Sequence, residues 1–255
     1  MERASALIVA WDGIVADNRA VIREMTQQAF QRLGLTFEHR DDDPGQPLRS
    51  LVAAAVAREG TCVTIEQFRR AEAHFGDAYA TALRGGRMVI HGDIILALDA
   101  LRANGVAIAL TTPHAVDLAA LICPTMERLC TIASAIVGGN DVGHCDPLHM
   151  RFVIAARRCD VEPSACCAVD VLPSGIRAIV AAGMCPIGIK TTPDSAIELG
   201  EVGATRTFIT RTELTPAVLH DVYYAWCRGA VASRFGTRSH RWSAALRDAD
   251  DPGIP

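Results

Sequence analysis

The stretch ALIVAWDGIVADN, residues 6–18, decides the fold of this chain. Residues 7–9 are apolar and predict a short strand, and the apolar run then breaks at Asp12-Gly13. An alanine, Ala10, stands two residues before Asp12. We therefore expect a buried first strand with the Asp12 carboxylate just beyond its carboxyl end.

Downstream of Gly85, short apolar runs alternate with amphipathic helical patterns. The expected strands are 106–110, 134–139, 165–170 and 185–189, and the expected helices are 94–104, 114–121, 152–158 and 174–182. Strands that alternate with helices form parallel sheets whose faces are covered by those helices. The pattern predicts an α/β protein with a Rossmann-like parallel sheet.

Between the first strand and this alternating region, the sequence predicts helices alone. Apolar residues recur at helical spacing over 19–33, 48–58 and 65–83. We expect residues 19–84 to form an inserted helical cap, and residues 1–18 and 85–216 to form the α/β core. Residues 217–255 are expected to add a C-terminal helix, packed on the core or on another subunit, and a tail in which Trp242 is a candidate docking contact.

The bulk composition favours a small-molecule or protein partner. The 255 residues carry a formal charge of −4 with a pI near 6.1, so there is no basic stripe for nucleic acid or an anionic membrane. The N-terminal apolar run is interrupted at Asp12, and no run reaches the roughly 18 apolar residues of a membrane span. We expect a cytoplasmic protein, in which self-association is compatible with the sequence.

The cysteines are expected to be thiols. Nine cysteines are scattered along the chain without the C-x-x-C spacing of a metal site. Cytoplasmic proteins keep their cysteines reduced, so we expect neither disulfides nor zinc.

Three polar residues follow predicted strands directly: Asp12, Thr111 and Asp170. Each has an ordinary local explanation, because Asp often caps a turn and Thr often caps a helix. Ligands of parallel sheets nevertheless bind beyond the carboxyl ends of the strands, where these three side chains are expected to meet. Their succession along the chain favours a shared pocket.

Four segments occur in the order of a known set of motifs. They are IVAWDGIVADN, HGDIILALDALRANGVAIALTT, IVGGNDVGHCDPLHMRFVIAARR and AVDVLPSGIRAIVAAGM. On these residues the chain resembles the haloacid dehalogenase superfamily, in particular its phosphatase and phosphomutase branch with a helical cap, over about residues 7–214. The resemblance implies a hydrolase-type core with an inserted cap, and phosphate-ester chemistry with Mg²⁺.

The resemblance also implies roles for single residues. Asp12 takes the place of the aspartate that handles the leaving group's proton, and Thr111 takes that of the second motif's hydroxyl. Four positions depart from the family: the nucleophilic aspartate is Ala10, the lysine is Asp146, the glutamate is Asp170 and the metal-binding aspartate is Val171. Lys190 is the only lysine of the chain, although an arginine such as Arg151 can supply a charge with a different reach and hydration.

These departures predict that the site no longer catalyses phosphoryl transfer. Loss of a nucleophile costs on the order of a millionfold in rate, and each unit charge pair at ~5 Å and an effective dielectric of ~20 is worth about 3 kcal/mol. We expect a pseudoenzyme that acts by binding a small ligand or a protein partner and needs no cofactor. If Mg²⁺ is bound, Asp12 and Asp170 are its expected ligands, with Asp146 in partial compensation.

Two catalytic alternatives stay open. The first is altered chemistry in the same cleft through Asp12 or Cys145. The second is a weak phosphatase in which water replaces the covalent step and Asp12 acts as the base. The fold alone does not separate these alternatives from a binding protein.

Overall fold

A computed structural model describes residues 4–40, 43–122, 126–142, 148–190 and 198–234 of the protein. Three residues singled out in the sequence, Cys145, Asp146 and Trp242, lie outside the described residues.

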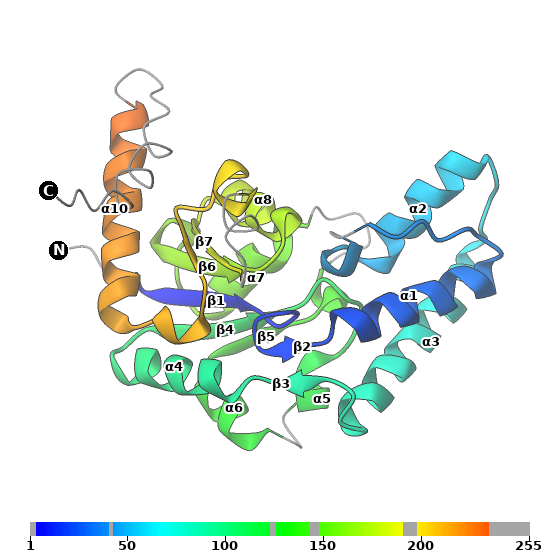
Figure 1. Cartoon of the computed structure of the whole chain (residues 1–255), viewed down its shortest axis with the longest axis horizontal. Coiled ribbons are helices and arrows are strands. Elements are labelled where there is room, and N and C mark those ends of the chain that lie inside the picture. Colours follow the sequence, from blue (N-terminus) through cyan, green and yellow to red (C-terminus); the bar gives the residue numbers. More distant parts are fainter. Residues whose placement is uncertain (1–3, 41–42, 123–125, 143–147, 191–197, 235–255) are drawn as a thin grey trace, which may run out of the picture.

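Six parallel strands form the central sheet (Figure 1). Their order across the sheet is β5 (Ala135–Val137), β4 (Ala107–Thr111), β1 (Ala6–Ala10), β6 (Cys166–Asp170), β7 (Cys185–Ile189) and β8 (Arg206–Phe208). All five residues of β1 are buried, and this strand pairs with β4 on one side and β6 on the other. The predicted α/β fold with a parallel, Rossmann-like sheet is confirmed.

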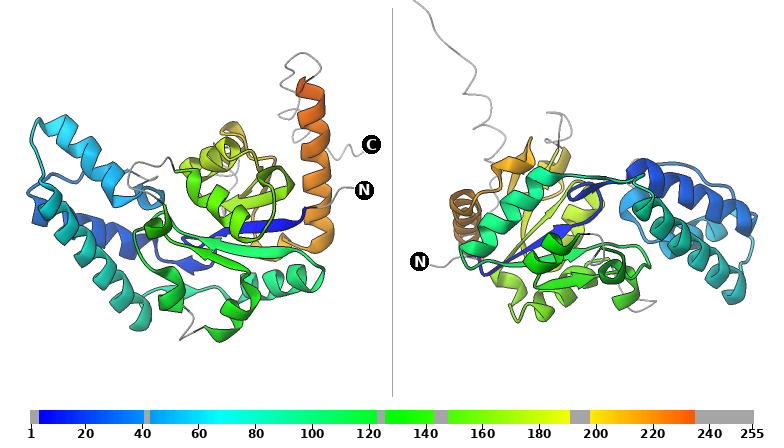
Figure 2. Two further views of the ribbon diagram at one scale, coloured as in Figure 1. Left: turned by 180° about the vertical axis from the view of Figure 1, so that it is seen from behind. Right: turned by 90° about the horizontal axis from the view of Figure 1, so that it is seen from below.

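Helices cover both faces of the sheet (Figure 2). Side chains of a strand alternate between faces, so Leu7 and Val9 pack in one apolar cluster while Ala6 and Ile8 pack in the other. On the Ile8 face lie α7 (Met150–Arg158) and α8 (Pro173–Ala181); on the Leu7 face lie α4 (Gly92–Ala103), α6 (Glu127–Ile132) and α10 (Pro216–Arg234). Among the described residues, no helix is both long and apolar enough to cross a bilayer.

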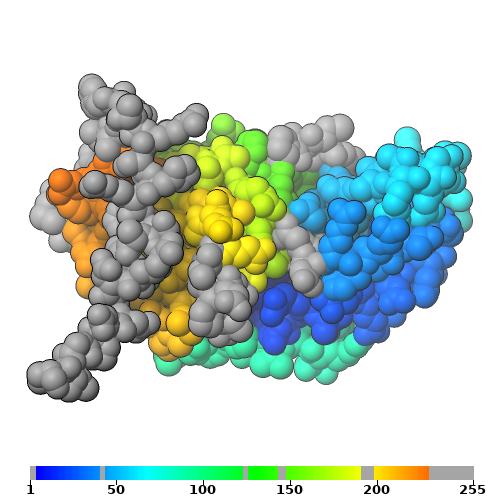
Figure 3. Space-filling model, turned by 45° about the horizontal axis from the view of Figure 1, so that its top comes forward, coloured from blue at the N-terminus to red at the C-terminus, as the bar shows by residue number. Residues whose placement is uncertain are grey.

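Three helices form a lobe at one end of the molecule, opposite α10 (Figures 1 and 3). They are α1 (Arg19–Leu33), α2 (Leu48–Glu59) and α3 (Ile65–Arg84). Local sequence sets their ends: α1 stops at Gly34, and α3 starts at a capping box in which Thr64 and Gln67 exchange hydrogen bonds. The described part of 19–84 contributes no strand to the six-stranded sheet.

A short antiparallel ribbon marks the place where the chain leaves and re-enters the core. β2 (Ala16–Asp17) leads into α1, β3 (Val89–Ile90) follows α3, and the two strands pair. The His91 N–H continues the ribbon with a 2.9 Å hydrogen bond to the Val15 carbonyl. Sequence analysis missed this ribbon because two-residue strands carry no periodicity.

The segment after β4 corrects the prediction of a helix over 114–121. The helix found there is α5 (Leu118–Ile122). The His114 carbonyl accepts hydrogen bonds from the Val116 N–H (2.8 Å) and from the Gly139 N–H (2.7 Å). Because these bonds commit residues 114–117 to a turn against the loop after β5, the helix begins four residues later than the apolar pattern indicates. The sequence also gave no prediction for α6 or β8.

One cysteine contradicts the expectation of thiols throughout the chain. Cys130 is disulfide-bonded. The free cysteines of the described residues are Cys62, Cys159, Cys166, Cys167, Cys185 and Cys227. The expectation failed because a disulfide depends on the distance between two cysteines in space, which scattered sequence positions do not reveal.

The loop after β5 approaches the loop after β4 so closely that a side chain at Gly138 is excluded. A Cβ placed there would overlap the Val116 carbonyl oxygen, whereas a Cβ on Gly92, at the start of α4, meets no atom within 4 Å. We expect Gly138→Ala to lower the free energy of unfolding by about 1–3 kcal/mol and Gly92→Ala to change it by less than about 0.5 kcal/mol. Urea denaturation measures both, and equal stabilities of the two variants would contradict this packing.

Candidate functional site

The carboxyl ends of β1, β4 and β6 bring most of the predicted site residues together. Ala10 ends β1 and pairs with Thr111, which ends β4, while Asp170 ends β6. Thr111 and Asp170 each lie two residues beyond an alanine that packs on the face covered by α7 and α8, so side-chain alternation directs them to that face. Ala10 packs in the apolar cluster of Leu7 and Val9. Ala10 is 4 % exposed and Thr111 is fully buried. The predicted meeting of these strand ends is therefore present.

The Asp12 carboxylate accepts three side-chain hydrogen bonds. Its Oδ2 accepts the Thr112 hydroxyl at 2.6 Å, and its Oδ1 accepts the Asn18 Nδ2 at 2.7 Å and the Tyr79 hydroxyl at 3.3 Å. The Asp12 side chain itself is buried. Burial, followed by the nearby Asp12 charge, holds the pKa of the Tyr79 hydroxyl well above its usual value, so Tyr79 is a hydrogen-bond donor at neutral pH.

The hydroxyl that contacts Asp12 belongs to Thr112, which the sequence analysis did not single out. Thr111 lies beside Ala10 in the sheet, and its hydroxyl has no hydrogen-bond partner among the described residues. Asn18 and Tyr79 were missed as well, because Asn18 reads as the residue before a helix and Tyr79 as part of an apolar helical stripe. Only the doubled threonine at 111–112 offered a signal for a second hydroxyl.

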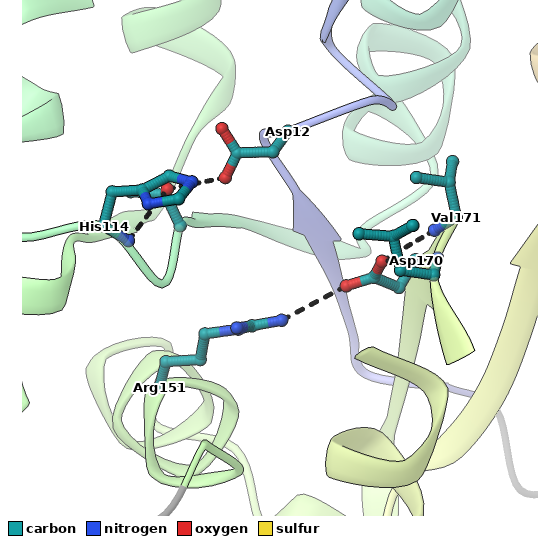
Figure 4. Close-up of polar contacts among 7 residues, drawn as sticks. Asp12, His114, Arg151, Asp170 and Val171 are labelled. Carbon is teal, nitrogen blue, oxygen red and sulfur yellow. Dashed lines mark hydrogen bonds and ion pairs between the residues drawn. The ribbon is translucent and has the colours of Figure 1, made fainter. Parts of the chain in front are cut away.

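A buried ion pair joins α7 to the end of β6 (Figure 4). The Arg151 Nη2 lies 3.2 Å from the Asp170 Oδ2, and the two side chains are 3 % and 5 % exposed. The Asp170 Oδ1 accepts the backbone N–H groups of Val171 (2.7 Å) and Leu172 (3.0 Å). A Cβ on Gly175 of α8 would overlap this carboxylate, so the helix packs directly against it.

Burial dominates the electrostatics of this pair. It raises the pKa of the Asp170 carboxyl to about 6. The Arg151 guanidinium and the N–H groups of Leu172 and Val171 partly offset this rise, because they lower the pKa. Burial also lowers the pKa of Arg151, and the Asp170 and Asp12 carboxylates partly offset this by raising it. Each partner is therefore kept ionised at neutral pH by the other and by the hydrogen bonds around it.

Several buried polar groups of the site have no partner among the described residues. They are the Nε and Nη1 of Arg151, the hydroxyl of Thr111, the Oδ1 of Asn18 and both ring nitrogens of His114. Figure 4 shows the Arg151 guanidinium reaching toward the space between Asp12 and Asp170. A ligand that occupied this region would meet hydrogen-bond donors from Arg151 and Thr111.

Apolar side chains stand where the resemblance implies two further carboxylates. Ala10 ends β1, and the Val171 side chain, 6 % exposed, packs against the backbone of Gly13. A Cβ on Gly13 would lie 2.5 Å from the Val171 Cγ2, and Gly13 has a positive φ of 79°, so glycine fits this turn for two reasons. Asp146, at the implied lysine position, lies outside the described residues.

Arg211, from the C-terminal part of the chain, holds the same turn by hydrogen bonds. Its Nε donates to the Ile14 carbonyl at 2.8 Å, and its Nη2 donates to the Gly13 carbonyl at 3.0 Å. These two carbonyls face a guanidinium, which positions the turn that carries Asp12. Sequence analysis gave no indication of this contact because about 200 residues separate its partners.

The carboxylates present do not fit a Mg²⁺ ion. Mg²⁺ demands near-octahedral coordination by oxygen, and all four carboxylate oxygens of Asp12 and Asp170 already accept hydrogen bonds from protein groups. Among the described residues, no group of three His, Cys, Asp or Glu side chains is placed to hold a metal. The expected fallback ligands Asp12 and Asp170 are thus the only two carboxylates that the described part of the site offers a metal, and Asp146 lies outside the described residues.

The His114 side chain is buried, and it packs against α3 of the helical lobe. Its ring lies 5.3 Å from the Phe75 ring and 6.2 Å from the Tyr79 ring, both on α3. Burial lowers the pKa of His114, and Arg151 lowers it further, whereas Asp12 and the Pro44 carbonyl raise it. Neither ring nitrogen has hydrogen-bond geometry toward that carbonyl. The ring is therefore neutral at pH 7.

The lowered pKa of His114 predicts a pH dependence of stability. Below about pH 6.5 the unfolded chain protonates this histidine while the folded chain does not, so the free energy of unfolding falls as the pH falls. His114→Phe keeps the ring contacts and removes this proton. We expect the wild type to lose up to about 1 kcal/mol more than His114→Phe between about pH 7.5 and pH 5.5. Parallel urea titrations at the two pH values measure this, and equal losses would contradict a neutral buried ring.

No protein-family model and no curated protein matches the sequence. Solved structures do match. The β-phosphoglucomutase of Clostridium difficile is 15 % identical, with 89 % of this chain and 100 % of that chain covered and a TM-score of 0.71. A putative β-phosphoglucomutase of Bacteroides vulgatus is 18 % identical, with 88 % and 90 % covered and a TM-score of 0.72.

A putative haloacid dehalogenase-like hydrolase of Bacteroides fragilis is also similar. It is 16 % identical, with 83 % of this chain and 100 % of that chain covered and a TM-score of 0.65. Identities this low establish the fold alone. The parallel sheet, the helical lobe inserted after β1 and these likenesses together show that the chain shares the α/β fold of these phosphomutase and haloacid dehalogenase-like structures.

Proposed function

We propose that this protein binds a small ligand at the strand ends and does not transfer phosphoryl groups. The observation that carries this proposal is Ala10 at the end of β1, where it pairs with Thr111. The similar structures are described as phosphomutases and hydrolases, and the resemblance places their nucleophile at this strand end. A methyl group has no lone pair with which to attack phosphorus.

Magnitudes support this choice. Removal of the nucleophile from a well-studied hydrolase costs on the order of a millionfold in rate, which is about 8 kcal/mol of transition-state stabilisation. The described groups do not replace that loss, since the carboxylate oxygens of Asp12 and Asp170 are already hydrogen-bonded and lack a fit to Mg²⁺.

The competing function is a weak hydrolase in which Asp12 activates a water molecule. A general base needs a lone pair within reach of the water's proton. In this structure Thr112, Asn18 and Tyr79 all donate to the Asp12 carboxylate, and these contacts favour a structural role for it. The retention of Asp12 is the one feature that keeps this alternative worth testing.

The unpaired groups indicate the chemistry of the ligand. Arg151 and Thr111 offer donors, whereas the carboxylate oxygens are already used as acceptors. Two carboxylates and one guanidinium give the described site a net charge near −1, which disfavours a phosphate dianion. A neutral or singly charged molecule with acceptor oxygens fits best. A protein partner, or self-association, is the second form of binding that we propose to test.

The proposal predicts no metal-dependent turnover of phosphate monoesters above a blank without protein. Purified wild type and Asp12→Asn are assayed side by side with Mg²⁺ over a panel of monoesters. A trace contaminant gives the same rate in both preparations, whereas activity in this site falls in Asp12→Asn. Turnover that Asp12→Asn abolishes would overturn the binding function and establish the hydrolase that uses Asp12.

A further inference from the structure

We propose that the guanidinium of Arg151 is the resident cation of this site and takes the charge-balancing role that a divalent metal would otherwise have. One of its nitrogens is bonded to Asp170, and the group reaches toward the space between Asp170 and Asp12 (Figure 4). The inference concerns the charge balance of the site, and it goes beyond the proposed binding function.

The place of Arg151 in the chain supports this role. It is the second residue of α7, whose first turn contains no acidic residue. A cation is unfavourable at the N-terminus of a helix, where the helix dipole favours anions. Arg151 is nevertheless 3 % exposed, so neither the helix nor solvent stabilises its charge. The carboxylate of Asp170, at hydrogen-bond distance, and that of Asp12 nearby are the charges that do.

A guanidinium suits this task without any metal. It stays protonated in proteins and donates through several N–H groups in one plane. Its Nη2 contacts the Asp170 Oδ2, and the Asp170 Oδ1 is held by two backbone N–H groups. The side chains of Val171 and Ala10 supply no oxygen to complete a metal's coordination. The site therefore has its positive charge built in.

A consequence follows for variants that lack this cation. Without Arg151, the Asp170 Oδ2 loses its partner and two buried carboxylates remain without a compensating charge. Such a pair attracts a divalent cation. We therefore expect Arg151→Met to gain an affinity for Mg²⁺ that the wild type does not have.

The experiment compares Mg²⁺ binding by calorimetry and by the shift in melting temperature. Arg157→Met is the matched control, because Arg157 is an exposed residue of the same helix and its loss changes the net charge equally. Wild type and Arg157→Met should show no Mg²⁺-dependent shift. Arg151→Met should bind Mg²⁺ at least about tenfold more tightly than the wild type and melt higher with Mg²⁺ than with a chelator. Adding Asp170→Asn to Arg151→Met should remove the gain.

Several outcomes would overturn the inference. They are tight Mg²⁺ binding by the wild type, no gain in Arg151→Met, and a gain that survives Asp170→Asn. If Arg151→Met does not fold in a chelating buffer, Mg²⁺ should restore its folding and that of the smaller change Arg151→Gln; failure to restore either also contradicts the proposal. Metal-independent turnover of a phosphate ester would contradict the proposed binding function, but it would not contradict this inference about Arg151.

Discussion

The hydrogen bonds on Asp12 connect the parts of the molecule on which the rest of the fold depends. Thr112 comes from the end of β4, Asn18 from the start of α1 and Tyr79 from α3. One carboxylate thus ties the central strand to its neighbour, to the crossing into the helical lobe and to the lobe itself. Removing this acceptor leaves the buried hydroxyls of Thr112 and Tyr79 without it, at a cost of about 1–3 kcal/mol for each unpaired donor. The Asn18 Nδ2 keeps one partner, because it also donates to the Tyr79 hydroxyl at 3.1 Å.

The buried ion pair of Arg151 and Asp170 allows each of these two charges to be buried. Its net contribution to the free energy of unfolding is small. Desolvation of two ions offsets most of their attraction in a protein interior, whereas removal of one partner costs about 3–5 kcal/mol because the other remains charged and buried. Arg151 and Asp170 therefore depend on each other. The two backbone N–H groups on Asp170 and the close approach of Gly175 hold one end of this pair in place.

Much of this arrangement follows from the sequence, for identifiable reasons. The apolar runs of β1, β4, β5, β6 and β7 are long enough to be recognised. Because parallel strands end at the same edge of the sheet, the sequence predicts that Asp12, Thr111 and Asp170 lie at that edge. Side-chain contacts between distant elements were not predictable. The bonds of Tyr79 to Asp12 and of Arg211 to the Gly13 carbonyl depend on how the lobe and the C-terminal part pack. The disulfide at Cys130 and the turn at His114 were not predicted for the same reason, because both depend on contacts between residues that are distant in the sequence.

The positions at which carboxylates occur in this site have a common physical feature. Asp12 holds the strand, the crossing and the lobe together, and Asp170 accepts the N–H groups of Val171 and Leu172, just before α8. Each therefore has a structural partner set that is independent of any reaction. Ala10 and Val171 instead pack in an apolar cluster, and Val171 lies against Gly13. A buried carboxylate is tolerated where the fold supplies hydrogen bonds and a compensating charge, as it does for Asp12 and Asp170, and it costs free energy where neither is present.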